Sequence, residues 1–248
     1  MVTLSTWLLW KWIKLTSVVV FAGGVFGTLS PSSRASRLWI AHWVMTPSWV
    51  LVWISGFWMM KTTGRPMSTM WILTSLFASY LTFHATVMIA YRREQPKSMT
   101  LWMAIWGLFA SLSVMVTRPI AWKLMAIVLG VSTLLSLPFV IFFSRISITD
   151  DVEDVSPYWT WFQWIARLEG LSLLLMLFVS MPLKYAFQIS LDRGTGLVGW
   201  THGVLLLVFM QSLVSSGRYL GWSWKKIGVG FLSSMVPFGT FVFEFKAR

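Results

Sequence analysis

Long apolar stretches separated by short polar breaks dominate the pattern of this 248-residue chain. A membrane-spanning helix needs about 20 mostly apolar residues. Eight stretches approach or reach that length: Thr6–Leu29, Leu38–Met60, Thr69–Ala90, Leu101–Val116, Ile120–Phe143, Ile165–Phe187, Gly196–Val214 and Ile227–Phe243. The pattern predicts an all-α polytopic integral membrane bundle of about eight transmembrane helices. The count falls to seven if Leu101–Phe143 forms one broken element.

Composition supports a lipid environment. Hydrophobic residues make up 56% of the chain and charged residues 11%, whereas soluble domains carry about 25% charge. Many of the 18 tryptophans stand near the expected span starts, which is typical of an aromatic belt at the membrane interface. The chain has no cysteine, which excludes disulfides, thiolate metal sites and cysteine nucleophiles.

One polar segment divides the chain. It holds four of the eight acidic residues: Asp150, Asp151, Glu153 and Asp154. We therefore predict an N-terminal bundle of four or five spans over residues 1–143, an acidic linker over 144–160 and a three-span module over 161–248.

The basic residues give a formal net charge of +12, yet they are spread over short loops. With eight spans, ten fall on each side of the membrane, so the excess of Lys and Arg that marks cytoplasmic loops does not decide orientation. Discounting Lys11 and Lys14, which lie partly inside the first span, places the cytoplasm on the side of Arg92 and Arg93, with both termini outside. Because these charges form no stripe, we expect contacts with lipid phosphates and no nucleic-acid partner.

Five ordered motifs after the linker resemble those of a known family. They are Arg167-Leu168-Glu169-Gly170, Met181-Pro182-Leu183-Lys184-Tyr185, Thr201-His202-Gly203, Trp224-Lys225-Lys226 and Pro237-Phe238-Gly239-Thr240. They are similar to the small three-span bacterial membrane proteins of the YdzA type, a family of unknown function. The resemblance covers about 80 residues, from Ala166 to Lys246, and implies a bacterial inner-membrane protein without implying an activity.

The first 110 residues or so carry weaker motifs. They are Trp12-Ile13-Lys14, Ala22-Gly23-Gly24, the segment from Phe83-His84 to Arg92-Arg93, and Val116-Thr117-Arg118-Pro119. These resemble the four-span HemJ-type protoporphyrinogen oxidases and related copper-resistance-type membrane domains. That family places a histidine, a haem ligand, three residues after the lysine of its first span, where this chain has Ser17. The resemblance thus implies a shared bundle and argues against inherited oxidase chemistry.

Ionisable side chains at membrane depth are costly and are candidates for function. In the C-terminal module, helical rise places Glu244 within about 2 Å in depth of Lys184, with His202 roughly 6 to 8 Å deeper. These three side chains could form a proton relay or an anion-binding pocket. Alternatively, Lys184 and Glu244 form an ion pair that fastens two helix ends, and His202 forms a hydrogen bond between helices.

Glu169 is expected near the opposite face, one turn inside the sixth span. Arg218 or Arg167 could neutralise it in a structural tether, and the alternative is a catalytic acid.

His42 and His84 fall on adjacent antiparallel spans at depths that agree to roughly 5 Å. They could ligate a b-type haem, or they could be interfacial histidines among tryptophans and headgroups. The 15 methionines form no Met-x-x-Met ladder with histidine, so we expect no copper site and no other metal site. No motif for a catalytic serine, a metalloprotease or a phosphate-binding loop is present.

We therefore predict a non-enzymatic protein without a required cofactor in the bacterial inner membrane, acting as a scaffold or as an accessory subunit. Small-residue runs such as Ala22-Gly23-Gly24 and Gly228-Val229-Gly230 offer faces for helix packing. We expect partner membrane proteins and bound lipids. The alternatives are a transporter or channel for protons or small ions, which requires Lys184, His202, Glu244 and Glu169 to line a wet cavity, and a haem-binding redox protein.

Overall fold

The computed structural model describes residues 4–30, 33–66, 68–92, 98–118, 121–145, 156–185, 187–189 and 196–247. The chain divides into two compact units, Met1–Val152 and Glu153–Arg248. Every regular element in these described ranges is helical, and seven helical segments are long and apolar enough to cross a membrane. The predicted all-α polytopic membrane bundle is confirmed.

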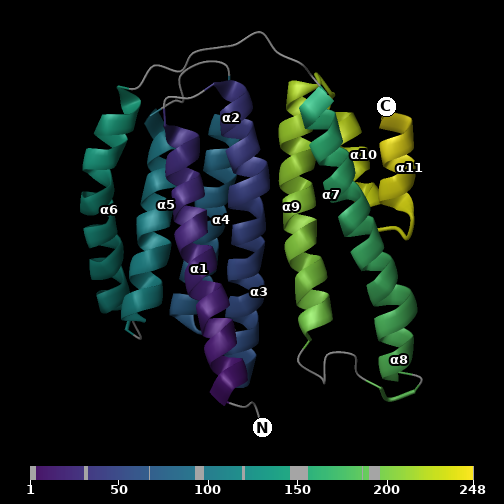
Figure 1. Ribbon diagram of the computed structural model, residues 1–248, viewed down its shortest axis with the longest axis horizontal. Coiled ribbons are helices and arrows are strands. Elements are labelled where there is room, and N and C mark those ends of the chain that lie inside the picture. Colours follow the sequence, from purple (N-terminus) through teal and green to yellow (C-terminus); the bar gives the residue numbers. More distant parts are fainter. Residues whose placement is uncertain are drawn as a thin grey trace. The chain divides into compact units, whose positions relative to one another are not determined.

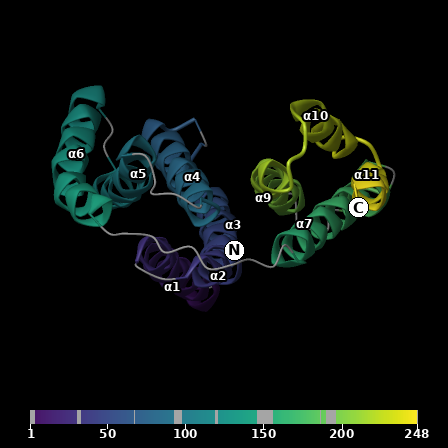
Figure 2. The ribbon, with the colours of Figure 1, turned by 90° about the horizontal axis from the view of Figure 1, so that it is seen from above.

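The N-terminal unit contains five spans. The first span is α1 (Leu4–Leu29). The second is one continuous segment made of α2 (Arg34–Trp39), the π-helix η1 (Ile40–Met45) and α3 (Thr46–Thr62). The other three are α4 (Met70–Ala90), α5 (Ser98–Thr117) and α6 (Trp122–Ser144). Helices α6, α5 and α4 stand in a row, and α1 and α3 pack against each other at its end (Figures 1 and 2). Residues Leu101–Phe143, considered above as one broken element, form two separate spans.

Close contacts hold the core of this unit together. Trp49 is fully buried and stacks on Phe83 with 4.5 Å between ring centroids, and the indole of Trp53 donates a hydrogen bond to Ser79 Oγ at 3.1 Å. Helices α4 and α5 meet where a Cβ on Gly107 would lie 2.7 Å from the carbonyl oxygen of Ala78. Only glycine permits that approach.

The C-terminal unit contains two spans and a helical hairpin. The first span joins α7 (Ser156–Leu175), the π-helix η2 (Met176–Ser180) and α8 (Met181–Tyr185), and the second is α9 (Leu197–Tyr219). They are followed by α10 (Trp224–Ser233) and α11 (Gly239–Ala247). Helix α7 packs against both α9 and α11.

The last two helices replace the expected eighth span. Helices of 10 and 9 residues extend only about 15 Å each, half of the hydrocarbon thickness. Residues 234–238 reverse the chain, with Phe238 in the left-handed region at φ 64°. Lys226 Nζ near the start of α10 donates to the carbonyl of Ala247 at the end of α11, at 3.2 Å. The hairpin of α10 and α11 therefore begins and ends at the same end of the C-terminal unit (Figure 1).

Local hydrogen bonds satisfy the backbone of this turn. The amides of Met235, Val236 and Gly239 donate to the carbonyls of Leu232, Ser233 and Val236, respectively. The hydroxyls of Ser233 and Ser234 donate to carbonyls three residues earlier. Irregular backbone within a membrane requires such satisfaction, and here Pro237 and Gly239 end a helical path that the apolar pattern suggested was continuous.

Both π-helices lie just before a proline. Pro47 and Pro182 are each the second residue of the helix that follows, α3 and α8. A proline inside a helix lacks an N–H and clashes with the carbonyl four residues earlier. The π-helices contain those residues, Trp43 and Phe178, and the wider turn accommodates each ring without ending the span.

Candidate functional site

Glu244 on α11 is held by two side chains of α7. Its carboxylate accepts hydrogen bonds from Arg167 Nη2 at 2.6 Å and Nε at 3.1 Å, and from Gln163 Nε2 at 2.9 Å. Gln163 and Arg167 are four residues apart and so share one face of α7. The pair ties the hairpin to the first span of the unit.

Lys184 is far from this pair, which corrects the predicted convergence of Lys184, His202 and Glu244. It lies in α8, exposed, with its ammonium 5.4 Å from the centroid of the Tyr185 ring. It follows Arg167 by 17 residues, about 25 Å along a helix axis. The expectation failed because the reversal at residues 234–238 returns α11 to the side from which α10 started.

Glu169 is fully buried between α7 and the start of α11. The neighbouring Gly170 lies so close to α11 that a Cβ there would meet the side chains of Thr240 and Phe241. The Thr240 hydroxyl is near enough to interact with the Glu169 carboxyl, yet neither carboxyl oxygen has a partner with hydrogen-bond geometry in the described part of the chain. Neither expected tether of Glu169 is found among the described residues: the Arg167 guanidinium binds Glu244, and that of Arg218 lies 5.8 Å from the centroid of the Trp224 ring.

His202 on α9 is joined to α7 through Ser172. The Ser172 hydroxyl donates to the carbonyl of Glu169 at 2.7 Å and lies 2.9 Å from His202 Nδ1. A hydroxyl has a single proton to donate, so His202 donates from Nδ1 and Ser172 accepts. This is the hydrogen bond between helices that the alternative interpretation of His202 describes.

The two histidines of the N-terminal unit have different neighbours. His42 is buried, and its Nε2 lies 2.9 Å from the hydroxyl of Tyr91. His84 lies against the ring of Tyr80, with centroids 6.2 Å apart, and precedes Tyr91 by seven residues, about 10 Å along α4. Nε2 of His42 faces Tyr91 and His84 faces Tyr80, so the two histidines have different neighbours, and haem ligation by this pair stays a prediction.

Two basic residues of α2 contact the C-terminal end of α4. Arg34 is buried and donates from Nη2 to the carbonyl of Tyr91 at 2.8 Å. Arg37, also buried, lies 3.4 Å from the carbonyl of Arg92. The end of α4 is thereby fixed to α2, which is a structural use of charges that the sequence places in a loop.

Sequence reasoning missed several members of these contacts. Gln163, Ser172, Thr240 and Tyr91 were not singled out. A usable signal existed for Gln163, because it stands one helical turn before Arg167. No comparable signal existed for Thr240, whose position beside Glu169 depends on the hairpin.

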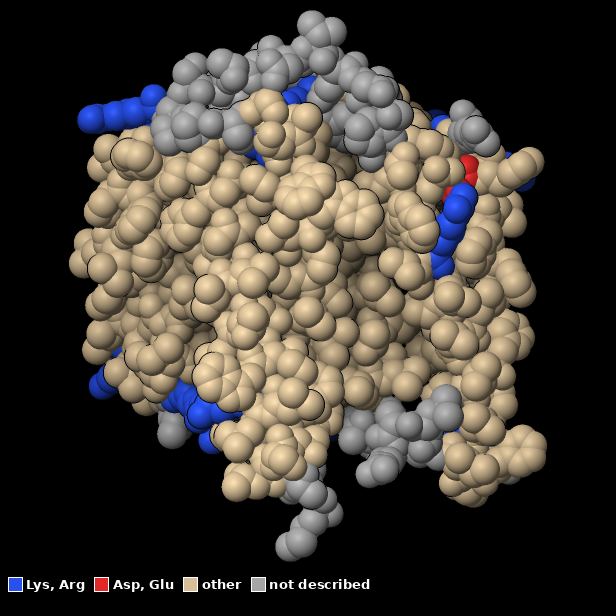
Figure 3. Space-filling view, in the orientation of Figure 1, with Lys and Arg blue, Asp and Glu red and all other residues tan. Residues whose placement is uncertain are grey.

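Taken together, these elements define a polytopic helical membrane protein whose C-terminal unit combines two spans with a hairpin that returns to the same side. On the face shown in Figure 3, charged side chains gather toward the helix ends and leave an uncharged band between them. The intramembrane carboxylates, Glu169 and Glu244, both belong to that C-terminal unit.

Comparison with known proteins identifies the family of this unit. Residues 159–248 match the domain of unknown function DUF3817. The chain is also similar to the uncharacterized membrane protein YdzA of Bacillus subtilis (strain 168), with 36% identity over 77 residues, which are 31% of this chain and 78% of YdzA. The chain belongs to this YdzA-like family, and the C-terminal resemblance is confirmed. No solved structure matches the chain.

The family match covers the hairpin, the Arg167–Glu244 pair and Glu169. It leaves out the N-terminal unit, with His42 and His84. The acidic segment predicted over residues 144–160 lies largely outside the described residues, over 146–155.

Proposed function

We propose that this chain is a non-enzymatic accessory subunit of a membrane protein complex in the cytoplasmic membrane of a bacterium. The observation that carries the proposal is how the polar groups of the C-terminal unit are used. Glu244 binds Arg167 and His202 binds Ser172, so both fasten helices of one unit together. The pocket described in this unit is lined by none of the four predicted residues, Lys184, His202, Glu244 and Glu169.

We propose α9 as the surface that binds the partner. Gly199 and Gly203 are four residues apart and share one face of this helix, and a Cβ on either would meet nothing within 4 Å in the described part of the chain. Glycines with this spacing let a second membrane helix approach closely. In the predicted small-residue runs, Gly24 and Gly230 are covered, by Met45 and by Leu213 with Phe243, whereas Gly23 and Gly228 are open but have no second open glycine four residues away.

Purification in mild detergent without crosslinking tests this proposal. We expect a stoichiometric membrane protein partner to copurify, and to be lost when Gly199 and Gly203 are both changed to leucine. Gly130→Leu in α6 is the matched control, because a Cβ there also meets nothing within 4 Å. A wild-type protein that purifies without a partner, or a partner retained by the double variant, contradicts the proposal.

Passage of protons or a small cation is a second candidate function, favoured by Glu169. A fully buried carboxylate with no cation beside it in the described part of the chain needs a proton or a cation to neutralise it. The buried hydroxyl of Ser212 on α9 likewise lacks a partner with hydrogen-bond geometry among the described residues. These groups lie in the same unit as the turn at residues 234–238, and breaks in membrane helices mark ion sites in many transporters.

Proteoliposomes loaded with a pH-sensitive dye test this second function. We expect proton entry above that of protein-free liposomes, lost in Glu169→Gln and retained in Glu169→Asp, with thermal unfolding showing that both variants are folded. Equal entry with and without the wild-type protein removes this function. It leaves the accessory-subunit proposal to its own test.

A further inference from the structure

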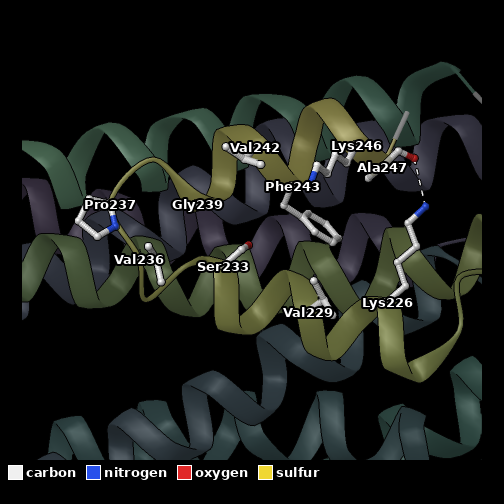
Figure 4. A pocket seen from close by; sticks show the side chains of 10 residues that line it. All are labelled: Lys226, Val229, Ser233, Val236, Pro237, Gly239, Val242, Phe243, Lys246 and Ala247. Atoms are coloured by element: carbon white, nitrogen blue, oxygen red, sulfur yellow. Dashed lines mark hydrogen bonds between the residues drawn. The ribbon is translucent and has the colours of Figure 1, made fainter.

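A groove runs between the two helices of the hairpin. It has a volume of about 530 Å³ and is lined by Val229 and Ser233 of α10, Val236 and Pro237 of the turn, and Gly239, Val242 and Phe243 of α11, with Lys226, Lys246 and Ala247 at one end (Figure 4). The volume falls within the range of about 300 to 1,000 Å³ that is common for ligand pockets. The groove therefore offers room for a ligand, independently of the Glu169 and Glu244 contacts.

The lining is apolar along most of its length and faces outward. Val229, Val236 and Val242 are more than half exposed, and Phe243 forms a buried floor. In a membrane, an outward apolar groove contacts lipid chains. A hydrocarbon chain therefore fits along the apolar part of the groove.

Both cations stand at the end away from the turn. Lys226 is in the first turn of α10, and Lys246 is next to the last residue of α11. Lys226 Nζ donates to the carbonyl of Ala247 and lies 4.4 Å from the centroid of the Trp222 ring. An ammonium has three donors, so capping α11 leaves Lys226 able to bind an anion beside Lys246.

The charge of the two lysines and the depth of the valines both favour an anionic lipid as the occupant of the groove. The hairpin starts and ends at the membrane surface, so the lysines lie at headgroup level and the valines lie deeper. Basic pockets between membrane helices at this level bind anionic lipid headgroups. We propose that the hairpin groove binds one anionic phospholipid, with its phosphate between Lys226 and Lys246 and one acyl chain along Val229, Val242 and Phe243.

Native mass spectrometry of the purified full chain tests the proposal. The protein is reconstituted in bilayers of phosphatidylglycerol and phosphatidylcholine and then extracted gently. We expect one phosphatidylglycerol to remain bound to the wild type. Neutralising one lysine, in Lys246→Gln, is expected to lower the preference for the anionic lipid about fivefold, the effect of one basic residue near an anionic surface. The double variant Lys226→Gln with Lys246→Gln should lose the preference.

Two further variants make the result specific. Lys225→Gln removes an equal charge from a residue of α10 that does not line the groove, and it should retain the lipid. Val242→Trp fills the groove and should lose both lipid classes while Lys226 and Lys246 remain. Because Lys246 is exposed, its single variant is expected to fold even if the double variant does not.

The groove has other conceivable occupants, and each gives a distinct contrary result. An unchanged lipid preference in Lys246→Gln, or lipid retained in Val242→Trp, overturns the proposal. So does a dimer mass without lipid, which indicates a second copy in the groove. Loss of the lipid on addition of inorganic phosphate alone indicates an anion site that does not use the acyl groove.

Discussion

Arg167 and Glu244 are 77 residues apart in the sequence and form a salt bridge, with Nη2 and Oε1 2.6 Å apart. The two side chains differ in environment: 53% of the arginine side chain is exposed and 9% of the glutamate. Removing the arginine therefore leaves a nearly buried carboxylate, whereas removing the glutamate leaves a cation that can still reach polar surroundings. The pair is thus energetically unequal.

We predict that Arg167→Leu lowers the thermal stability of the detergent-solubilised protein more than Glu244→Leu does. Combining the two should restore part of the loss, because no unpaired carboxylate then remains. Lys184→Leu is the control, since Lys184 is the partner that the sequence suggested. Equal destabilisation by Lys184→Leu and Arg167→Leu would contradict the observed pairing.

Gly107 is expected to resist even a small substitution. In Gly107→Ala the new Cβ would meet the backbone carbonyl of Ala78 at 2.7 Å and the amide of Thr82 at 3.2 Å, and backbone atoms cannot rotate away. Overpacking of this kind costs about 1 to 3 kcal/mol. Gly130→Ala, on the neighbouring α6, has open space and should be neutral or slightly stabilising. Chemical unfolding in mixed micelles measures both, and equal stabilities would show that α4 and α5 are not in this contact.

We expect all seven candidate spans to cross the membrane, which puts the start of α1 and the end of α11 on opposite sides. With eight spans, Lys246 would lie on the side opposite to Lys225 and Lys226. Because the last two helices form a hairpin, Lys246 lies on the same side as Lys225 and Lys226. This breaks the tie of ten basic residues against ten and favours that side as cytoplasmic. We therefore expect the N-terminus outside and the C-terminus inside, in place of the earlier expectation of both outside.

Single-cysteine labelling measures this topology directly, because the chain has no cysteine of its own. Lys225→Cys and Lys246→Cys should react with a membrane-impermeant maleimide from the same side, and Arg65→Cys from the other. Met235→Cys, in the turn, should react from neither. Labelling of positions 225 and 246 from opposite sides would show that the last helices cross the membrane.

Tyr91 is predicted to stabilise the buried His42. Tyr91→Phe removes the hydrogen bond to Nε2 and should cost about 1 kcal/mol. Tyr80→Phe should cost less, because the contacts of Tyr80 in the described part of the chain are ring contacts with Trp49 and His84, which phenylalanine keeps. The purified protein, with haem added, is expected to show no Soret band that depends on His42. A band that disappears in His42→Ala would restore the haem hypothesis.

The sequence predicted the fold class well because apolar length alone determines which segments can span a membrane. The first five predicted stretches and the seventh correspond closely to long helices. The sixth, Ile165–Phe187, begins several residues inside the observed span Trp159–Tyr185. The stretch Ile227–Phe243 was misinterpreted because hydropathy does not report direction. Pro237, together with Phe238 in the left-handed region, reverses the chain there.

That single reversal explains why the candidate site was predicted only in part. Depth estimates assume that each residue adds about 1.5 Å in a constant direction. After Phe238 the chain runs back in the opposite direction. Glu244 therefore lies beside Arg167, and not beside Lys184 as the depth estimate had predicted. His202 was less affected, because it precedes the hairpin, and its predicted interhelical hydrogen bond is present.

The hairpin also bears on how the protein is made. A hairpin that starts and ends on one side of the membrane does not require the chain end to cross the bilayer. The last 25 residues or so can therefore remain at the membrane surface until the other helices have inserted. Glu244 acquires its partners, Gln163 and Arg167, only once α11 packs against α7. We expect the hairpin of α10 and α11 to insert into the membrane last during biosynthesis, after α7 and α9 have packed together.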